Sequence, residues 1–593
     1  MKYQSLILVA LLLCTACTKN LDPWNNTDPN SGNNGQQQSD TPTETDPTYS
    51  DVDVDDSDDE ISNTTFDCTI SITYSGNTAS VSGSAENVAV EKDGARVTVT
   101  NSGEKTVKYI LSGSSTDGFF KLYSSKKQAI VLKGLSLANT KGAAINNQSK
   151  KRTFVVLEGT NTLADAAVNS SGDYEEETAD EDMKAAFFSE GQLIFSGSGS
   201  LTVSAVGKAG ITSDDYVRFM DGSNVKVTCA KGHGVRGKDA VIMSGGKLEV
   251  SLEATATGKK CVTTDSLFYI SGGAMTLTNK ASAGTVDSEL TGAAGIKADQ
   301  TFVMKGGQLA ITSSGKGCKG ISCDKNGYFE GGSVTVAVTG ANYGSSGWGS
   351  SSNSVSSKAI KFDGNLEFSG ADVTASASSH EAIESKNTIY ISGGCISAIS
   401  GDDCINSSST MTISGGVIYA YSTGNDGLDA NGNLIIKGGT VYAIGKGSPE
   451  VAIDANTEQN YRLYIQGGTI IAIGGLESNS SVSESMISTS WVKNTFYTLC
   501  DGDTVLFSFK APASGGTGLY MLSPDISSGS KYTLKTSATI SGETSYFNGI
   551  LSLGGTATGG SETSVTASSY SSGGNTPGGG GGGGNPGGPG GRW

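Results

Sequence analysis

The sequence is poor in residues on which several common chemistries depend. It has only two histidines, His233 and His380, in 593 residues, and neither stands in the context of a nucleophilic triad. After Cys14 and Cys17, eight cysteines remain without paired zinc-type spacing, so small buried thiols are favoured over a disulfide framework. Charged residues make up 17%, and no matched pair of carboxylates suited to glycoside hydrolysis can be singled out. These absences leave triad, zinc and hydrolase chemistry without support.

Positive charge and long apolar runs are also scarce. The net charge of -18 argues against nucleic acid and favours cations or neutral partners. The apolar run Leu6–Leu13 is too short to span a bilayer. With Lys2 before it and small residues leading to Cys17 after it, the run predicts a lipoprotein signal peptide over residues 1–17. We therefore expect lipidation of Cys17 and a place in the cell envelope, anchored to the outer membrane and exposed at the surface.

Glycine is abundant, and glycine pairs recur between alternating apolar runs. Degenerate pairs occur at Gly197-Ser198, Gly222-Ser223 and Gly370-Ala371. Full pairs begin at Gly245, Gly272, Gly306, Gly331, Gly393, Gly415, Gly438 and Gly467. A period near 23 residues with occasional insertions indicates one supersecondary unit stacked many times. The chain is therefore a solenoid, whose function lies in columns of residues repeated along a surface.

The pattern within one unit predicts short strands. Leu434 and Ile436 alternate with polar residues before a glycine pair, and Val441 and Ala443 alternate after it. Period two in such short runs indicates strands of a few residues with one face buried. Two or three such strands in about 23 residues predict an all-β parallel β-helix. A β-propeller needs about 40 residues per blade and fits the period less well.

Composition divides the chain into five parts. Residues 18–65 are polar and end in an acidic run, which predicts a disordered acidic tether. The repeats predict a β-helix over residues 66–475. Residues 476–571 keep strand-like alternation without the period, so we expect a small β-domain that closes the C-terminal end. Residues 572–593 form a disordered glycine-rich tail.

Equivalent positions of stacked rungs can be read as columns. Each rung is anchored on one apolar residue: Val235, Val262, Ile296, Ile321, Ile360, Ile383, Ile405, Leu428 and Ile453. The positions two before and one after the anchor change from basic to acidic between Ile360 and Ile383. At that step, Lys358 over Glu381 and Lys361 over Glu384 would form cross-rung ion pairs.

Acidic residues accumulate in the rungs beyond that step, where the equivalent positions carry no lysine or arginine. Like charges on adjacent strands repel one another, and a bound cation would remove the repulsion. Calcium fits because its oxygen ligands lie about 2.3–2.6 Å away, so that one ion can bridge two rungs. Asn406 and Asn425 could complete the ligand set; the alternative is a solvated acidic edge without metal. The acidic candidates are Asp402, Asp403, Asp426, Asp429, Glu450 and Asp454.

Three stretches carry a family resemblance: "KAAFFSEGQLIFSGSGSLTVSA" from Lys184, "GDDCINSSSTMTISGGVIYA" from Gly401 and "GNDGLDANGNLIIKGGTVYA" from Gly424. They resemble the calcium-dependent carbohydrate-binding β-helix family of plant-polysaccharide-degrading clostridia and gut Bacteroidetes, over most of residues 120–475. The resemblance implies a right-handed parallel β-helix that binds plant polysaccharides, with calcium at rung corners. The implied ligands are Asp402, Asp403, Asp426, Asp429 and Asp454. Upstream rungs such as "GHGV" and "GKKCV" lack the acidic residues, which confines calcium to the last rungs.

Aromatic residues suggest two surfaces. Tyr419, Tyr421 and Tyr442 occupy outward positions of adjacent rungs, where they could stack on sugar rings. Isoleucines beside them make the patch apolar, so docking of the C-terminal domain is the favoured alternative. Tyr343 and Trp348 on a glycine-serine insertion are either sugar contacts or loop anchors.

Three functions compete at this point. The leading one is a non-catalytic polysaccharide-binding lipoprotein that acts as a monomer with calcium. The second is a calcium-dependent polysaccharide lyase of the pectate type, with Lys358 or Lys361 as the base. Ion pairs of these lysines with Glu381 and Glu384 would make them unfit as bases. The third is a surface adhesin or structural spacer.

Overall fold

The structure is a computed structural model that describes residues 51–344 and 353–570. The predicted signal peptide with Cys17, Trp348 and the predicted tail over 572–593 lie outside the described residues. Within the described residues, no helix is long and apolar enough to cross a membrane.

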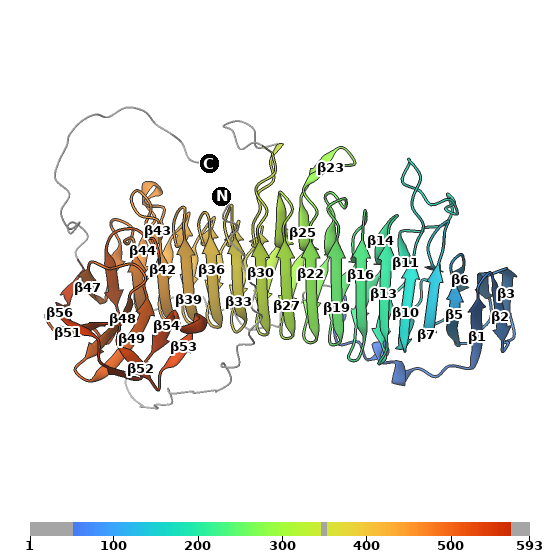
Figure 1. Ribbon diagram of the computed structural model, residues 1–593, viewed down its shortest axis with the longest axis horizontal. Coiled ribbons are helices and arrows are strands. Elements are labelled where there is room, and N and C mark those ends of the chain that lie inside the picture. The colour runs from blue at the N-terminus through green and yellow to red at the C-terminus, as the bar shows by residue number, and fades with distance from the viewer. Residues whose placement is uncertain (1–50, 345–352, 571–593) are drawn as a thin grey trace, which may run out of the picture. The chain divides into compact units, whose positions relative to one another are not determined.

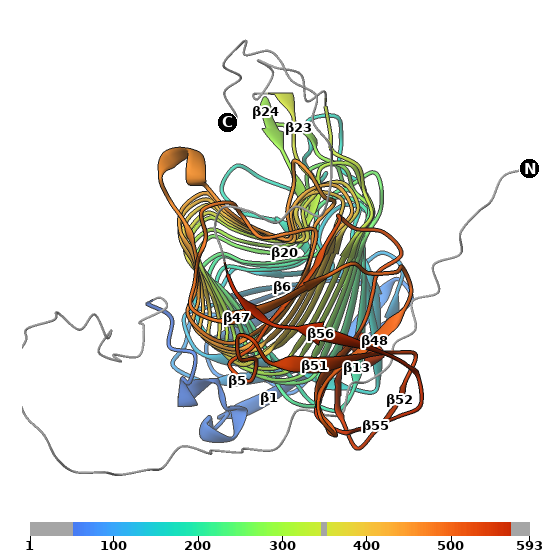
Figure 2. The ribbon, with the colours of Figure 1, turned by 90° about the vertical axis from the view of Figure 1, so that its left-hand side faces the viewer.

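The described chain is a parallel β-helix, as the glycine-pair period predicts. Each rung contributes a strand to each of three rows, and equivalent strands of successive rungs pair in parallel (Figure 1). Rows A and B belong to one continuous sheet, and row C is a separate sheet of 15 strands. Viewed along the stack, the rungs superimpose and enclose one interior (Figure 2).

Row A forms the face seen in Figure 1. Its strands are β1 (Cys68–Ser75), β5 (Val107–Ser115), β7 (Gln128–Ala138), β10 (Thr160–Ala164), β13 (Ser200–Ala205), β16 (Asn224–Cys229), β19 (Lys247–Leu252), β22 (Ala274–Asn279), β27 (Gln308–Ser313), β30 (Ser333–Val338), β33 (Asp372–Ala377), β36 (Cys395–Ser400), β39 (Val417–Ser422), β42 (Thr440–Ile444) and β45 (Thr469–Ile473).

Row B precedes row A within each rung. Its strands are β9 (Thr153–Glu158), β12 (Leu193–Ser196), β15 (Tyr216–Phe219), β18 (Ala240–Met243), β21 (Leu267–Ile270), β26 (Thr301–Met304), β29 (Asn326–Phe329), β32 (Leu366–Phe368), β35 (Ile389–Ile391), β38 (Met411–Ile413), β41 (Leu434–Ile436), β44 (Leu463–Ile465) and β46 (Ser481–Val482). The long strand β7 pairs with both β9 and β10 and so joins the two rows.

Row C follows row A. Its strands are β3 (Val88–Asp93), β4 (Arg96–Asn101), β6 (Phe119–Ser124), β8 (Ile145–Asn147), β11 (Ala185–Ser189), β14 (Ala209–Ser213), β17 (Val235–Gly237), β20 (Lys260–Thr264), β25 (Ala293–Ala298), β28 (Cys318–Cys323), β31 (Ile360–Phe362), β34 (Ile383–Ser385), β37 (Ile405–Ser407), β40 (Leu428–Ala430) and β43 (Ile453–Ala455). Outside the rows, β2 (Thr78–Ser82) pairs antiparallel with β1, and β23 (Gly284–Val286) pairs with β24 (Glu289–Thr291).

The core confirms the predicted columns. The anchor residues from Val235 to Ile453 pair with one another in unbroken register along row C, and all of them are buried. Leu434, Ile436, Val441 and Ala443 are likewise fully buried. No disulfide bond joins the eight cysteines of the described residues, as the absence of paired spacing predicts.

The glycine pairs turn the chain between row B and row A. The second glycine takes the left-handed backbone conformation, with φ of 83° at Gly439. A Cβ atom there would lie 2.8 Å from the carbonyl oxygens of Gly415 and Gly416 on the preceding rung. Both the conformation and the close stacking of rungs therefore require glycine.

The C-terminal part of the described chain packs at the end of the β-helix. Strand β50 pairs antiparallel with β45, the last strand of row A. The strands of the C-terminal part are β47 (Ser485–Thr489), β48 (Phe496–Asp501), β49 (Thr504–Lys510), β50 (Leu519–Leu522), β51 (Lys531–Thr536), β52 (Thr539–Ser541), β53 (Thr544–Tyr546), β54 (Leu551–Leu553), β55 (Thr556–Thr558), β56 (Ser561–Thr566) and β57 (Ser568–Ser569). Six of them form an antiparallel sheet in the order β53-β54-β49-β48-β51-β56.

Residues 51–65 differ from the predicted disordered tether. They contain the short 3-10 helices η1 (Ser57–Asp59) and η2 (Ile61–Asn63), two of four such helices with η4 (Thr457–Gln459) and η5 (Phe547–Gly549) in the described residues. Val52, Val54 and Ile61 pack on an outward apolar column of row B. Asp59 is 1% exposed and pairs with Arg218 at 2.9 Å. We name residues 51–67 the strap; its order depends on distant partners that local composition does not reveal.

Candidate functional site

The predicted acidic column is present at the last rungs of row C. Asp429 on β40 lies directly opposite Asp454 on β43, and Asn406 on β37 lies opposite Asp429. The Asn406 amide donates to Asp429 Oδ2 at 2.7 Å and to Asp403 Oδ2 at 3.3 Å. The register therefore brings together the carboxylates that the sequence aligned.

Two of these aspartates link successive rungs through the backbone. The Asp426 N–H donates to Asp403 Oδ1 at 3.0 Å, and the Val451 N–H donates to Asp426 Oδ1 at 2.6 Å. Asp403 and Asp426 are only 6% and 5% exposed. Glu450 is partly exposed and directly precedes Val451. The loops that enter row C are thus held in register by buried carboxylates.

Burial raises the pKa of two carboxyl groups in this column, and neighbouring carboxylates add to the effect. Burial raises the pKa of Asp403 to about 6, and the neighbouring Asp402 adds to the shift. Burial also raises the pKa of Asp454, with further contributions from Glu477 and Asp426. Glu477, which hydrogen-bonds Asp454, was missed by the column analysis because it follows the last full rung. The fold therefore places several carboxyl groups close together at the last rungs of row C.

A histidine joins the edge of the column. His380 Nδ1 lies 3.2 Å from Asp402 Oδ2 and is also in contact with Glu381. Within residues 51–344 and 353–570, only two groups place three potential ligand atoms within 4.8 Å of one another: His380, Glu381 and Asp402, and Asp182, Glu190 and Asp214. Of the six predicted ligands, Asp402 alone belongs to either group. The sequence offered no signal for His380, because it lies in the turn before a rung and outside the two columns that were read.

The donor set fits a hard cation. Carboxylate oxygens of five aspartates, with Glu477 and the amide oxygens of Asn406 and Asn425 nearby, are the ligand types that calcium prefers. Asp429 and Asp454 stand on adjacent parallel strands, which are spaced by about 4.8 Å. Such a spacing is suited to an ion that bridges rungs.

The basic residues next to the column are engaged in ion pairs. Lys358 is 7% exposed and lies 3.1 Å from Glu381 Oε2 and 2.5 Å from Glu384 Oε2. Lys361 lies opposite Glu384 in the register but pairs with Asp363 instead. The predicted pair of Lys358 with Glu381 is present, and the pair of Lys361 with Glu384 is not. A buried ammonium held by two carboxylates is poorly placed to reach a substrate proton.

The outward tyrosines at the last rungs lie beneath the C-terminal domain. Tyr442 is fully buried, Tyr419 is 5% exposed, and both belong to a cluster with Phe509 and Phe547. Tyr421 is partly buried, and its hydroxyl hydrogen-bonds Ser514 at 2.9 Å. The assignment of these tyrosines to sugar binding is therefore wrong for this conformation. The favoured alternative, docking of the C-terminal domain, is confirmed.

The aromatic insertion is only partly described. Tyr343 is partly buried and forms an isolated antiparallel bridge with Val355 across the base of the insertion. This contact is typical of a loop anchor. Trp348 lies outside the described residues, so its proposed sugar contact stays a prediction.

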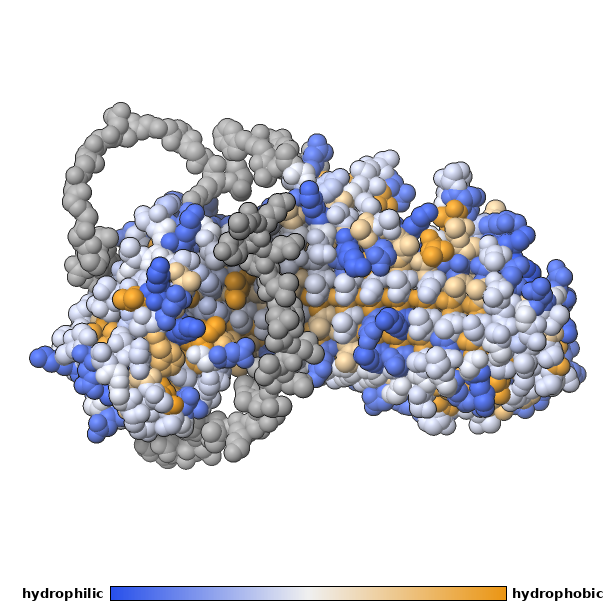
Figure 3. Space-filling view, in the orientation of Figure 1, coloured by the Kyte–Doolittle hydropathy of each residue, from blue (hydrophilic) through white to orange (hydrophobic). Residues whose placement is uncertain are grey.

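One exposed tyrosine, Tyr390, lies on row B in an outward column that also holds the partly buried Tyr328, outside the columns aligned from the sequence. Tyr328, Glu367 and Tyr390 occupy one outward column on β29, β32 and β35. Tyr390 is 42% exposed. Two rungs, or about 9.6 Å, separate the two tyrosines. Row A, by contrast, shows mostly intermediate hydropathy in Figure 3, where its outward positions are rich in serine and threonine.

The fold and the site define a parallel β-helix protein with a polar, rung-ordered surface. Its sequence matches the model of a family described as "Carbohydrate-binding domain-containing protein" over residues 93–257 and 302–420. Both matched stretches lie within the β-helix, so the chain is similar to carbohydrate-binding domain proteins in its rungs.

Other comparisons add little. No curated protein matches the chain significantly. One solved structure matches, described as "Structure of the polysaccharide lyase-like protein from C. thermocellum, Gadolinium derivative". It is 19% identical, and the alignment covers 52% of this chain and 97% of that chain with a TM-score of 0.32. At this TM-score the likeness carries no weight for fold or function.

Proposed function

We propose that this protein is a non-catalytic polysaccharide-binding protein whose β-helix surface holds glycans of the plant cell-wall type. The observation that carries the proposal is the match of the β-helix rungs to the carbohydrate-binding domain family. The ion pairs of Lys358 with Glu381 and Glu384, and of Lys361 with Asp363, add support, because they disfavour both lysines that a lyase could use as its base.

Row B offers the better sugar-binding surface, since Tyr419 and Tyr442 of row A are buried and Tyr421 is partly buried. An exposed phenol ring presents an apolar face for a sugar ring and a hydroxyl for hydrogen bonding. Tyr390 and Tyr328 lie in one column, so a chain that runs along the stack would meet both. The glycan in this proposal lies across the rungs of row B.

Replacing Tyr390 by alanine should weaken glycan binding about two- to tenfold, the effect of one lost ring contact of about 0.5–1.5 kcal/mol. Binding is measured by affinity electrophoresis in homogalacturonan, pectin and soluble cellulose oligomers. Tyr461→Ala is the matched control, because Tyr461 is 39% exposed but lies outside this column.

The same samples separate the competing functions. Binding without new ultraviolet absorbance from an unsaturated product supports a binding protein, whereas rising absorbance would indicate a lyase. Retention of none of the glycans would leave an adhesin or spacer. Equal loss on replacement of Tyr390 and Tyr461 would remove row B as the binding surface.

Calcium is part of the proposal. Asp402, Asp403, Asp426, Asp429 and Asp454 would hold it, with Glu450 and Glu477 at the margin. The support is the juxtaposition of Asp429 and Asp454 on adjacent parallel strands. When bound, the ion would supply positive charge that offsets repulsion between rungs and would stiffen the surface next to the C-terminal domain.

Calcium should raise the melting temperature of the protein relative to the same protein in chelator. At about 100 times the dissociation constant, binding to the folded state alone adds about 2.7 kcal/mol of stability. The double variant Asp429→Asn and Asp454→Asn should lose this response. In chelator its stability should stay close to that of the parent, because burial raises the pKa of Asp454 and the protonated carboxyl group already avoids repulsion with Asp429.

Asp93→Asn with Asp503→Asn is the control, because both aspartates are exposed and distant from the column in sequence. This variant should keep the full calcium response. An unchanged melting temperature of the parent on adding calcium would contradict the metal site. A full response in the Asp429 and Asp454 double variant would contradict the assigned ligands.

The place of the protein in the cell is likewise a proposal. Lipidation of Cys17 would anchor it to the outer membrane, with the β-helix presented as a monomer at the surface. The support is the signal-like pattern of residues 1–17, and mass spectrometry of the purified envelope protein tests it.

A further inference from the structure

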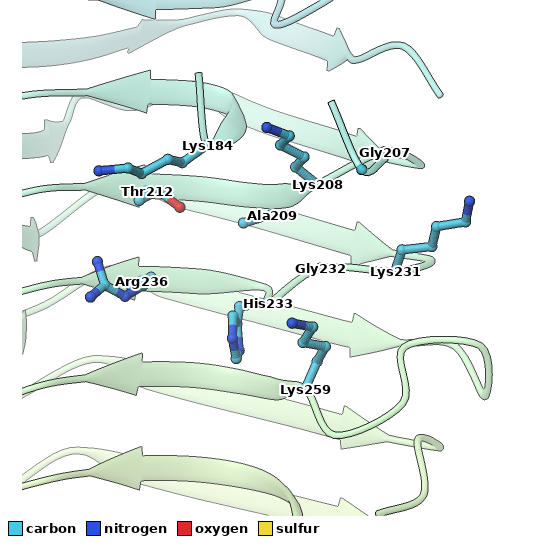
Figure 4. Close-up of a pocket in the computed structure, with 11 residues that line it drawn as sticks. Lys184, Gly207, Lys208, Ala209, Thr212, Lys231, Gly232, His233, Arg236 and Lys259 are labelled. Atoms are coloured by element: carbon cyan, nitrogen blue, oxygen red, sulfur yellow. The ribbon is translucent and has the colours of Figure 1, made fainter. Parts of the chain in front are cut away.

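A basic pocket lies at the corner between row A and row C, far along the stack from the acidic column. It has a volume of about 400 Å³ and is lined by residues that enter β11, β14, β17 and β20 (Figure 4). Its charged lining consists of Lys184, Lys208, Lys231, Arg236 and Lys259. None of its eleven described lining residues is an aspartate or a glutamate.

Three of the five cations are partly neutralised by neighbours outside the lining. Lys184 lies 2.5 Å from Asp214, Lys208 lies 2.5 Å from Glu177, and Arg236 lies 2.7 Å from Asp265. Lys231 and Lys259 form no ion pair with any residue that the structure describes. Two positive charges in the lining are therefore not compensated there.

Two neutral groups add hydrogen-bonding capacity. The Lys260 N–H donates to His233 Nδ1 at 3.1 Å. Burial lowers the pKa of His233 well below its usual value, and Lys260 and Lys259 lower it further, so the ring is neutral with its proton on Nε2. Thr212 is 1% exposed, and its Oγ1 has no hydrogen-bond partner within the described residues. A ligand that accepts hydrogen bonds would satisfy both.

We propose that this pocket binds an oxyanion carried by a glycan, either the carboxylate of a uronic acid or a sulfate ester. The proposal rests on the proposed function, which supplies the glycan. It names a site distinct from the acidic column and from the tyrosines of row B.

Charge and size select this ligand. A chain with a net charge of -18 repels anions on average, so a pocket without acids in its lining is a local exception. Its volume of about 400 Å³ lies within the range of about 300–1,000 Å³ typical of small-molecule sites. A free inorganic ion would leave most of that space unfilled, whereas a sugar unit with an anionic substituent would occupy it.

Basic residues continue beyond the pocket along row C. Lys260 pairs in register with Ala294, and Ala294 with Lys319. Burial, together with neighbouring lysines, lowers the pKa of Lys260 and Lys319 to about 8. An anionic chain that leaves the pocket along the stack would meet these ammonium groups. The register thus allows a polymer, and not only a single sugar, to be held.

The test compares the full chain with the double variant Lys231→Ala and Lys259→Ala. These lysines form no described ion pair, so the fold should tolerate their loss. Probes are a galacturonic acid oligomer, a sulfated gluco-oligomer and a neutral gluco-oligomer, with inorganic phosphate as the free ion. Affinity for one acidic oligomer should fall about tenfold or more, because the charge-assisted hydrogen bonds of two lysines to the oxyanion are lost. The affinity of the double variant for that oligomer should also depend less on salt concentration than the affinity of the parent.

Lys493→Ala with Lys531→Ala is the charge-matched control, since both residues are exposed and form no ion pair within residues 51–344 and 353–570. Control binding should equal that of the parent. The acidic oligomer whose binding falls in the pocket variant shows whether the pocket binds a carboxylate or a sulfate ester. Unchanged acidic-oligomer binding in the pocket variant overturns the proposal, as does phosphate that binds as tightly as either oligomer. If the protein binds only the neutral glycan, the proposal that the pocket binds an oxyanion is wrong, but the proposed polysaccharide-binding function stands. If it binds no glycan, both proposals are wrong.

Discussion

Replacing Asp59 by alanine is expected to release the strap from the β-helix. Asp59 Oδ2 lies 2.9 Å from Arg218 Nη1, and Asp59 Oδ1 lies 2.8 Å from Arg152 Nε and accepts from the Tyr216 hydroxyl at 2.6 Å. The side chains of Asp59 and Arg218 are 1% and 8% exposed. Removal of one partner of a buried pair costs about 3–5 kcal/mol, because the other charge stays buried without it. Hydrogen exchange of the η1 and η2 amides should therefore accelerate by about two to three orders of magnitude.

Asp58→Ala is the matched control on the neighbouring residue. Asp58 pairs with Lys127 at 2.7 Å and with Arg152 at 3.2 Å, but the Asp58 and Lys127 side chains are 57% and 37% exposed. Exposed pairs contribute little, so exchange in the strap should change only a few-fold. Equal acceleration in both variants would show that the strap is held by net charge and not by the buried pair.

The second large effect is expected at Tyr442, whose replacement by alanine should lower the free energy of unfolding by about 3–5 kcal/mol. The ring is fully buried between the β-helix and the C-terminal domain, 5.4 Å from both Tyr419 and Phe509. Its loss leaves a cavity in a hydrophobic cluster that joins row A to that domain. Urea denaturation followed by circular dichroism measures the loss, and limited proteolysis shows whether the C-terminal domain is the part released.

Two further variants separate burial from chemistry. Tyr442→Phe removes only the hydroxyl, which donates to the Lys510 carbonyl at 2.9 Å, and should cost about 0.5–1.5 kcal/mol. Tyr390→Ala, at an exposed position, should stay within about 0.5 kcal/mol of the parent. A Tyr442→Ala protein of normal stability with impaired glycan binding would return Tyr442 to the sugar-binding surface.

The fold could be predicted because each rung of a stacked fold repeats the same sequence pattern, and this repeat determines the register between rungs. Buried apolar residues must recur once per rung, and only glycine fits the corner at Gly439, so period and column follow from residue type. The same logic correctly aligned Asn406, Asp429 and Asp454, which pair on adjacent strands.

Several features could not be predicted in this way. Column alignment predicted that Lys361 would pair with Glu384, but Glu384 is bonded to Lys358 and Lys386 instead. The length and conformation of the side chains determine which ion pairs form between rungs, and the register of the strands does not specify them. His380 and Glu477 lie in turns outside the two columns, so their contacts with Asp402 and Asp454 depend on how the turns fold.

The sequence by itself determined the parallel β-helix, its rung register and the rows of acidic and basic residues, because these follow from a local pattern repeated every rung. Only the tertiary structure decided which outward surfaces remain open. The strap covers part of row B, and the C-terminal domain covers Tyr419 and Tyr442. The basic pocket is lined by residues of four successive rungs. Each of these depends on contacts between residues far apart in the chain, whose pairing no periodic pattern encodes.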